Sequence, residues 1–179
     1  MTNSSLDRFI AAVRADWGQI STRLVRQCRD HLDQLTASPE AEDWLATLVA
    51  ERPATRELHR EPGSFMLLAH AEQGGLYRPP HDHGRAWVVY AVQSGELEIG
   101  TYARVAGPDG DRLVRRETTV LKPGNARAYL PGDIHDTRCL TPQALVFRFT
   151  ERDLKHEDQV DHQITRFVER DGEWFAPIA

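Results

Sequence analysis

The spacing of hydrophobic positions divides the chain into a helical N-terminal part and a longer part made of strands. In the first fifty residues, apolar side chains recur three or four positions apart, the period of one face of an α-helix. Two such stripes consist of Leu6, Phe9, Ile10, Val13 and Trp17, and of Ile20, Leu24, Cys28, Leu32 and Leu35. Ser38 and Pro39 predict the start of a third helix, with the hydroxyl as N-cap, and Pro53 predicts its end.

After Pro53 the pattern changes to short apolar runs separated by turn signals rich in glycine and proline. Regular alternation of strands and turns over about a hundred residues favours a β-sandwich or small barrel over βαβ units. The mixed acidic and basic stretch 151–162 is interpreted as a solvated connection. The predicted strands are 54–60, 64–71, 86–93, 96–104, 113–121, 126–131, 136–140, 143–150 and 163–169.

Composition and charge narrow the classes of partner. A length of 179 residues suits one structural domain, in which a helical segment 1–53 packs on a barrel formed by 54–179. A net charge of -5 gives no electrostatic reason to expect nucleic acid as a partner. No apolar run approaches membrane-spanning length, and no signal-peptide core is recognisable, so no membrane partner is expected. Two cysteines make a disulfide framework improbable and favour a cytoplasmic location.

Three histidines carry the candidate chemistry. His81 and His83 flank Asp82, and His135 follows much later in the run Pro131-Gly132-Asp133-Ile134-His135. Residues two apart on a β-strand point to the same face, so His81 and His83 can reach a common centre. A third imidazole from a distant strand would complete a facial triad that leaves the other side of a metal ion open to substrate.

These residues resemble the two motifs of the cupin superfamily. Gly75, His81 and His83, Val88 and Gly95 follow the spacing of the first motif, and the run ending at His135 looks like the second. The resemblance covers about residues 54 to 150 and implies a mainly β fold, a double-stranded β-helix (cupin jelly roll) preceded by N-terminal helices. It also implies a metal ion held between the sheets.

Within that superfamily, the chain resembles the cysteine dioxygenase-like branch of three-histidine thiol dioxygenases. Many cupins have a glutamate ligand at the position of Val88, and the branch resembled here lacks that carboxylate too. Helices also precede the barrel, as they do in that branch. The resemblance implies an Fe(2+) dioxygenase that inserts O2 into a small anionic substrate, a thiol acid such as cysteine or 3-mercaptopropionate or a related anion. It places Arg56 where the substrate carboxylate is bound.

The chain departs from that branch on the strand after the third ligand. Thiol dioxygenases carry a serine, a histidine and a tyrosine there, whereas this sequence has Val146, Arg148 and Thr150. Alternation directs either Arg148 or its phenylalanine neighbours into the barrel, and helices outside would cover the phenylalanines. Arg148 is therefore a second candidate for substrate binding. Tyr90 shares the inward face of its strand with Val88, and His70 alternates inward, so both are candidates for catalytic or supporting groups.

Other interpretations remain open at this point. Three histidines also suit a zinc enzyme that activates water, and Zn(2+), Ni(2+) and Mn(2+) are alternatives to iron. A cupin that binds a small ligand without turnover is a third interpretation. A homodimer is compatible with this fold class, because jelly rolls often pair through edge strands.

Overall fold

Three helices form the N-terminal part of the computed structural model, which describes residues 4–108 and 110–177. They are α1 (Ser5–Asp16), α2 (Thr22–Thr36) and α3 (Asp43–Glu51). A capping box starts α1, because the Ser4 hydroxyl accepts from the Asp7 amide while the Asp7 carboxylate accepts from the Ser4 amide. The predicted start of the third helix at Ser38 is wrong: the Ser38 hydroxyl donates to the Leu35 carbonyl at the end of α2, and Glu42 is the N-cap of α3.

Two antiparallel sheets follow the helices. The first has the order β1-β2-β9-β4-β7 and the second the order β10-β11-β6-β5-β8-β3. Strands far apart in sequence are neighbours in both sheets, β2 with β9 and β3 with β8, which is the arrangement of a jelly roll. The strands are β1 (Arg56–Arg60), β2 (Met66–Gln73), β3 (Tyr77–His81), β4 (Val88–Ser94), β5 (Leu97–Val105), β6 (Arg112–Leu121), β7 (Arg127–Tyr129), β8 (Ile134–Cys139), β9 (Gln143–Thr150), β10 (Val168–Arg170) and β11 (Glu173–Phe175).

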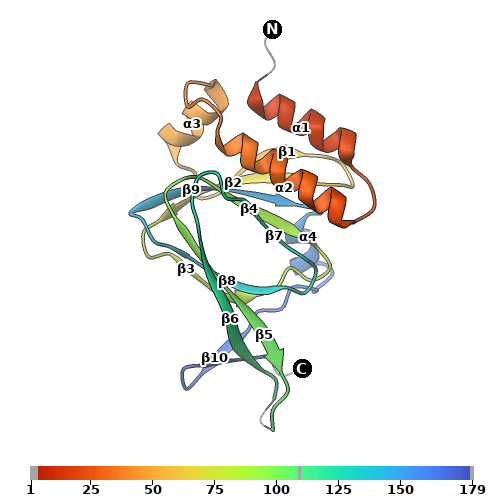
Figure 1. Ribbon diagram of the computed structural model, residues 1–179. Coiled ribbons are helices and arrows are strands. Elements are labelled where there is room, and N and C mark those ends of the chain that lie inside the picture. The colour runs from red at the N-terminus through yellow and green to blue at the C-terminus, as the bar shows by residue number, and fades with distance from the viewer. Residues whose placement is uncertain (1–3, 109, 178–179) are drawn as a thin grey trace.

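The helices cover the outer face of the first sheet (Figure 1). One buried cluster joins side chains of α1, α2 and α3 to the outward positions of β2, β4 and β9. Aromatic rings form its middle, where Trp17 contacts Phe65 and Phe149 with ring centroids 5.0 and 6.1 Å away. The helical segment and the sheet thus share one hydrophobic core, as the amphipathic stripes predict.

A second buried cluster fills the space between the two sheets. Alternation along β4 places Val88, Tyr90 and Val92 in this inner cluster and Val89 and Ala91 in the outer one. The second sheet contributes Leu97, Ile99, Leu121 and Cys139 to the inner cluster. Beyond it, β5 and β6 extend as a long two-stranded ribbon, with β10 beside its far end (Figure 1).

Most predicted strands are confirmed, with ends shifted by a few residues. Several segments differ from the expectation. The strands β3 and β11 were not among the predicted ones. Residues 151–162 contain a helix, α4 (Leu154–Gln159), with Leu154 and Glu157 buried, rather than a solvated connection. The predicted strand 163–169 is reduced to a single bridge at Arg166 and the start of β10. Across the described parts of the chain, the helices lack the length and apolar character needed to cross a membrane.

Candidate metal centre

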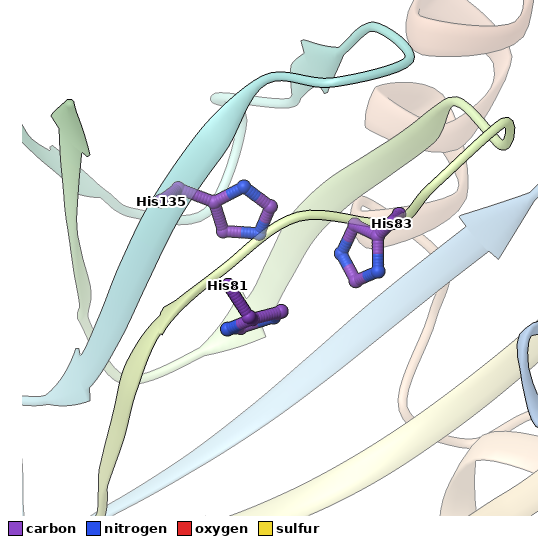
Figure 2. A group of neighbouring side chains, drawn as sticks. All are labelled: His81, His83 and His135. Atoms are coloured by element: carbon purple, nitrogen blue, oxygen red, sulfur yellow. The ribbon is translucent and has the colours of Figure 1, made fainter. Parts of the chain in front are cut away.

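The three predicted histidines converge between the two sheets (Figure 2). His81 is the last residue of β3 and lies opposite His135 of β8 in the strand register. Each histidine offers a ring nitrogen, and these nitrogens lie within 4.8 Å of one another. The ring centroids are 4.8 to 5.1 Å apart, so the imidazoles face a common point. The structure therefore brings together the residues that the motif spacing predicted.

His83 reaches this point from a turn rather than from a strand. The strand ends at His81, and the Asp82 carboxylate accepts hydrogen bonds from the amides of Gly84 (3.0 Å) and Thr165 (2.9 Å). Gly84 has a φ of +60°, and a Cβ there would meet Gln163 at 2.8 Å, so the turn requires glycine. The expectation that His81 and His83 share a strand face is wrong, and a fixed turn positions the second imidazole instead.

The protonation of the three rings suits metal binding. Burial lowers the pKa of all three, well below the usual value for His83 and to about 3 for His135. The His81 Nδ1 lies 2.8 Å from the Pro79 carbonyl, which fixes the proton on Nδ1 and leaves the lone pair on Nε2. Neutral imidazoles are the form that coordinates a metal ion.

Unpartnered nitrogens provide a direct test of fit. The Nδ1 of His83 and both ring nitrogens of His135 are buried and have no hydrogen-bond partner among the described residues. Buried polar atoms are rarely left unpaired, because each costs free energy. A cation bound by the three imidazoles would satisfy one nitrogen of each ring. The donor set of this chain therefore fits a divalent metal ion.

A pocket of about 580 Å³ opens beside His81 and His83. The end of β3, the inner face of β9 and the segment around α4 provide its walls. Its lining residues are Arg78, Pro79, Pro80, His81, His83, Arg148, Leu154, Lys155, Asp158, Ile164, Arg166 and Phe167. A small molecule in this pocket would reach the open side of the three-histidine group.

Arg148 faces this pocket, as alternation along its strand predicts. Its neighbours Phe147 and Phe149 belong to the cluster under the helices, which leaves the arginine on the inner face. In the sheet register Arg148 lies between Leu68 and Tyr90. Its Nε is buried and has no hydrogen-bond partner in the described structure. The guanidinium is therefore placed to receive an anionic group.

Tyr90 contacts one of the three histidines, His83. Its hydroxyl is 3.2 Å from the Nε2 of His83, and both side chains are buried. Burial raises the pKa of the phenol, and the nearby guanidinium of Arg148 opposes that rise. Tyr90 therefore connects one of the three histidines to the side chain that faces the pocket.

His70 of β2 is buried, and it follows Ala69, which belongs to the cluster under the helices. His70 therefore lies on the inner face of the sheet. Its Nδ1 lies 3.0 Å from the Thr55 hydroxyl, and its Nε2 has no partner within the described ranges. Burial, with the positive charge of Arg148, lowers its pKa to about 3. His70 is absent from the pocket lining, so the structure places it near the site but not at its surface.

Arg56 is not brought to the histidines. It pairs with Ala69 in the register of β1 and β2, and Ala69 belongs to the cluster under the helices. Paired residues share a face, so Arg56 lies on the side of the sheet away from the pocket. Its guanidinium forms an ion pair with Glu51. The resemblance suggested a substrate contact at this position, but the geometry of the sheet directs the side chain elsewhere.

Several residues of the site were not found by sequence reasoning. Arg78, Lys155, Asp158 and Arg166 line the pocket, although Lys155 and Asp158 lie in the segment 151–162 that was interpreted as a solvated connection. Tyr129 packs on His135 with ring centroids 4.5 Å apart. Alternation along β7 could have indicated Tyr129, because it pairs with the inward Val88. The other four carry no sequence signal that separates them from ordinary surface charges.

No family model and no curated protein matches the chain. Solved structures with similar folds include KdgF from Halomonas sp., at 23% identity and a TM-score of 0.45 over 55% of this chain and 79% of that one. The cupin domain of Schizosaccharomyces pombe Cnp3 aligns at 12% identity and a TM-score of 0.45, over 59% of this chain and 68% of that one. A cupin-2 domain containing protein from Shewanella frigidimarina aligns at 14% identity and a TM-score of 0.47, over 63% and 96%. The jelly-roll assignment itself follows from the strand order and register of this chain.

Proposed function

We propose that this protein is a metal-dependent enzyme that uses iron(II) and O2 to oxidise a small anionic substrate, a thiol acid such as 3-mercaptopropionate or cysteine or a related acid. The observation that supports the proposal is the convergence of His81, His83 and His135 beside a pocket that the guanidinium of Arg148 faces. The cysteine dioxygenase-like motifs suggest the reaction class. An oxidation at an open three-histidine centre is the function that this arrangement supports best.

The three histidines would hold the ion and leave part of its coordination sphere open. Because all three imidazoles are neutral, they leave the charge of a divalent ion uncompensated, which favours an anionic donor atom of the substrate. When bound, iron(II) supplies an open site for that donor atom and the redox chemistry with O2. Val88 adds no carboxylate, so it leaves this charge unchanged.

Arg148 would hold the acidic group at the other end of the substrate. A guanidinium binds a carboxylate through two parallel hydrogen bonds, which fixes the orientation of the substrate as well as its position. The Tyr90 hydroxyl, 3.2 Å from His83, would hold that imidazole in orientation. Fixed contacts at both ends would place the reacting atom beside the metal centre.

A zinc-dependent, non-redox enzyme is the second candidate. Three histidines with an open fourth position are also the donor set of catalytic zinc sites, in which the ion lowers the pKa of bound water. Metal analysis of protein purified without added metal separates the two candidates. Zinc at one ion per chain, with hydrolysis and no oxygen consumption, would favour the zinc enzyme and contradict the dioxygenase.

Oxygen consumption tests the proposed function. Iron-loaded protein is expected to consume O2 with at least one member of a panel of thiol acids and related acids, measured with an oxygen electrode. His135→Ala removes one of three ligands and is expected to abolish both iron binding and turnover. His156→Ala, at a histidine with a side chain 60% exposed, is the matched control and should leave both unchanged. No consumption by the fully iron-loaded protein across the panel would contradict the proposal.

A further inference from the structure

The pocket beside the histidines differs in charge from the rest of the chain. The whole sequence has a formal charge of -5, yet four of the residues that line the pocket are cationic. These are Arg78, Arg148, Lys155 and Arg166. Asp158 is the single carboxylate among the described lining residues. A cleft lined mainly by one sign of charge concentrates ligands of the opposite sign.

The carboxylate of Asp158 is already occupied. Arg166 donates to both of its oxygens, from Nη1 to Oδ1 at 2.6 Å and from Nη2 to Oδ2 at 2.8 Å. Glu72 is buried, does not line this pocket and accepts from Arg78 at 2.5 Å. A ligand ammonium group in this pocket would therefore meet several cations and no free carboxylate in the described lining.

Arg148, in contrast to Asp158, has no partner of opposite charge in the described structure. No carboxylate lies within ion-pair distance of its guanidinium in the described part of the chain, and its buried Nε has no partner. Leu68 and Tyr90, its cross-strand neighbours, carry no negative charge. Arg148 is thus the lining arginine whose charge remains available to a ligand.

We propose that the pocket selects small acids with two anionic groups and excludes substrates that carry an ammonium group, with Arg148 as the anion-binding residue and the Arg166–Asp158 pair as the specificity determinant. The inference rests on the proposed function, because it concerns the substrate of the same site. It narrows the substrate to an acid whose second donor is a thiolate, enolate or carboxylate, and it removes α- and β-amino acids. Specificity of this kind comes from repulsion of the wrong ligand as much as from attraction of the right one.

Three acids of the same length measure this selectivity. Malonate, propionate and β-alanine each have three carbons and a carboxylate at one end. At the other end malonate has a second carboxylate, propionate a neutral methyl group and β-alanine a positive ammonium group. Their dissociation constants are measured by calorimetry with metal-free protein and again with zinc-loaded protein, in which no redox chemistry occurs. We expect malonate to bind about tenfold or more tightly than propionate, and β-alanine to bind weakest, in both forms. Equal or tighter binding of β-alanine, or no binding of malonate, would overturn the inference.

Two variants are expected to act in different directions. Arg148→Gln should weaken malonate binding about tenfold or more, because a guanidinium that has no carboxylate partner is lost. Arg166→Gln frees the Asp158 carboxylate, so it should raise the affinity for β-alanine relative to malonate. The Arg166 side chain is 64% exposed, so losing this ion pair should leave the fold intact. Arg138→Gln is the control, since that guanidinium lies over the Tyr77 ring on the outer face.

The outcomes separate this inference from the proposed function. Failure of the iron-loaded protein to consume O2 contradicts the oxidation, while the affinity order of the three acids still tests the pocket. Rapid oxygen consumption with cysteine and none with 3-mercaptopropionate would support the oxidation and overturn the exclusion of ammonium groups. Unchanged selectivity in Arg166→Gln would likewise overturn the role of the Arg166–Asp158 pair.

Discussion

At the scale of single residues, two buried phenols flank the three histidines but differ in their hydrogen bonds. The Tyr90 hydroxyl lies 3.2 Å from the Nε2 of His83. The Tyr129 ring packs on His135, yet its hydroxyl has no hydrogen-bond partner among the described residues. Groups that hold a ligating histidine in orientation contribute measurably to metal affinity. The two tyrosines therefore form a matched pair for mutation.

Tyr90→Phe is expected to weaken metal binding about 10- to 100-fold, because His83 loses the group that orients it. Tyr129→Phe should leave the affinity nearly unchanged, since its hydroxyl makes no hydrogen bond in the described structure. Competition with a chelator of known affinity measures both, using zinc or cobalt. Equal losses in the two variants would show that packing around the histidines, not the Tyr90 hydroxyl, determines the affinity.

At the scale of elements, the N-terminal helices are bound to the sheet by a continuous core. Leu32 of α2 and Leu45 of α3 are fully buried and belong to the same cluster as Phe147 and Phe149 of β9. The opposite face of β9 carries Arg148 into the pocket. The apolar side of β9 therefore packs against the helices, and the other side presents Arg148, a candidate for substrate binding, to the pocket.

Leu32→Ala is expected to lower the free energy of unfolding by about 2 to 5 kcal/mol, because it removes buried methyl groups and leaves a cavity. Leu76→Ala, at a side chain 41% exposed, should change it by less than about 0.5 kcal/mol. Urea denaturation followed by tryptophan fluorescence measures both. Metal binding by folded Leu32→Ala should persist, as Leu32 lies outside the inner cluster. Two separate unfolding transitions would contradict a shared core.

The segment after β9 shows how an element missed by periodicity builds the site. Glu157 of α4 is buried and accepts from the Arg85 side chain at 2.8 Å, which ties the helix to the turn after His83. Asp158 then lies next to Arg166 at the pocket. The mixed charges of 151–162 suggested exposure to solvent. Pairing with charges from distant segments is what made burial of this stretch possible.

At the scale of the whole molecule, the buried neutral histidines couple folding to pH. The pKa of His70 and of His135 is lowered to about 3 in the folded protein, against about 6.5 in an unfolded chain. Between these values the unfolded state binds protons that the folded state does not. Stability therefore falls as the pH decreases below about 6.5, and it is unaffected by these groups above that value.

The metal-free protein is expected to lose stability steadily from pH 6.5 towards pH 4. Each buried histidine contributes a slope of up to about 1.4 kcal/mol per pH unit in this range. The free energy of unfolding in urea at several pH values gives the slope. His70→Gln should reduce it by the share of one histidine, whereas His156→Ala, at an exposed position, should reduce it by much less. A stability that is constant or rises on acidification would contradict the lowered pKa values.

Much of this protein could be predicted from local pattern. Helical and strand periodicity indicated three N-terminal helices and most strands, and motif spacing indicated the three ligating histidines. Alternation grouped Tyr90 with the inward Val88 and predicted that His70 also faces inward. It put Arg148 on the opposite face from its phenylalanine neighbours, and the expected helices outside the barrel then assigned the inner face to the arginine. These features depend on residues close in sequence, or on motifs whose spacing is characteristic by itself.

Apart from Arg148, the charges that face the histidines were decided by the tertiary structure alone. Arg56 and Arg166 are both arginines in unremarkable surroundings, yet the sheet register turns one towards the helices and the return of the chain after α4 brings the other to the pocket. Whether a polar side chain is free or paired depends on partners many positions away, as with Arg85 and Glu157 or Asp82 and Thr165. Periodicity determines the face of a residue, and only the packing of distant segments determines its neighbours.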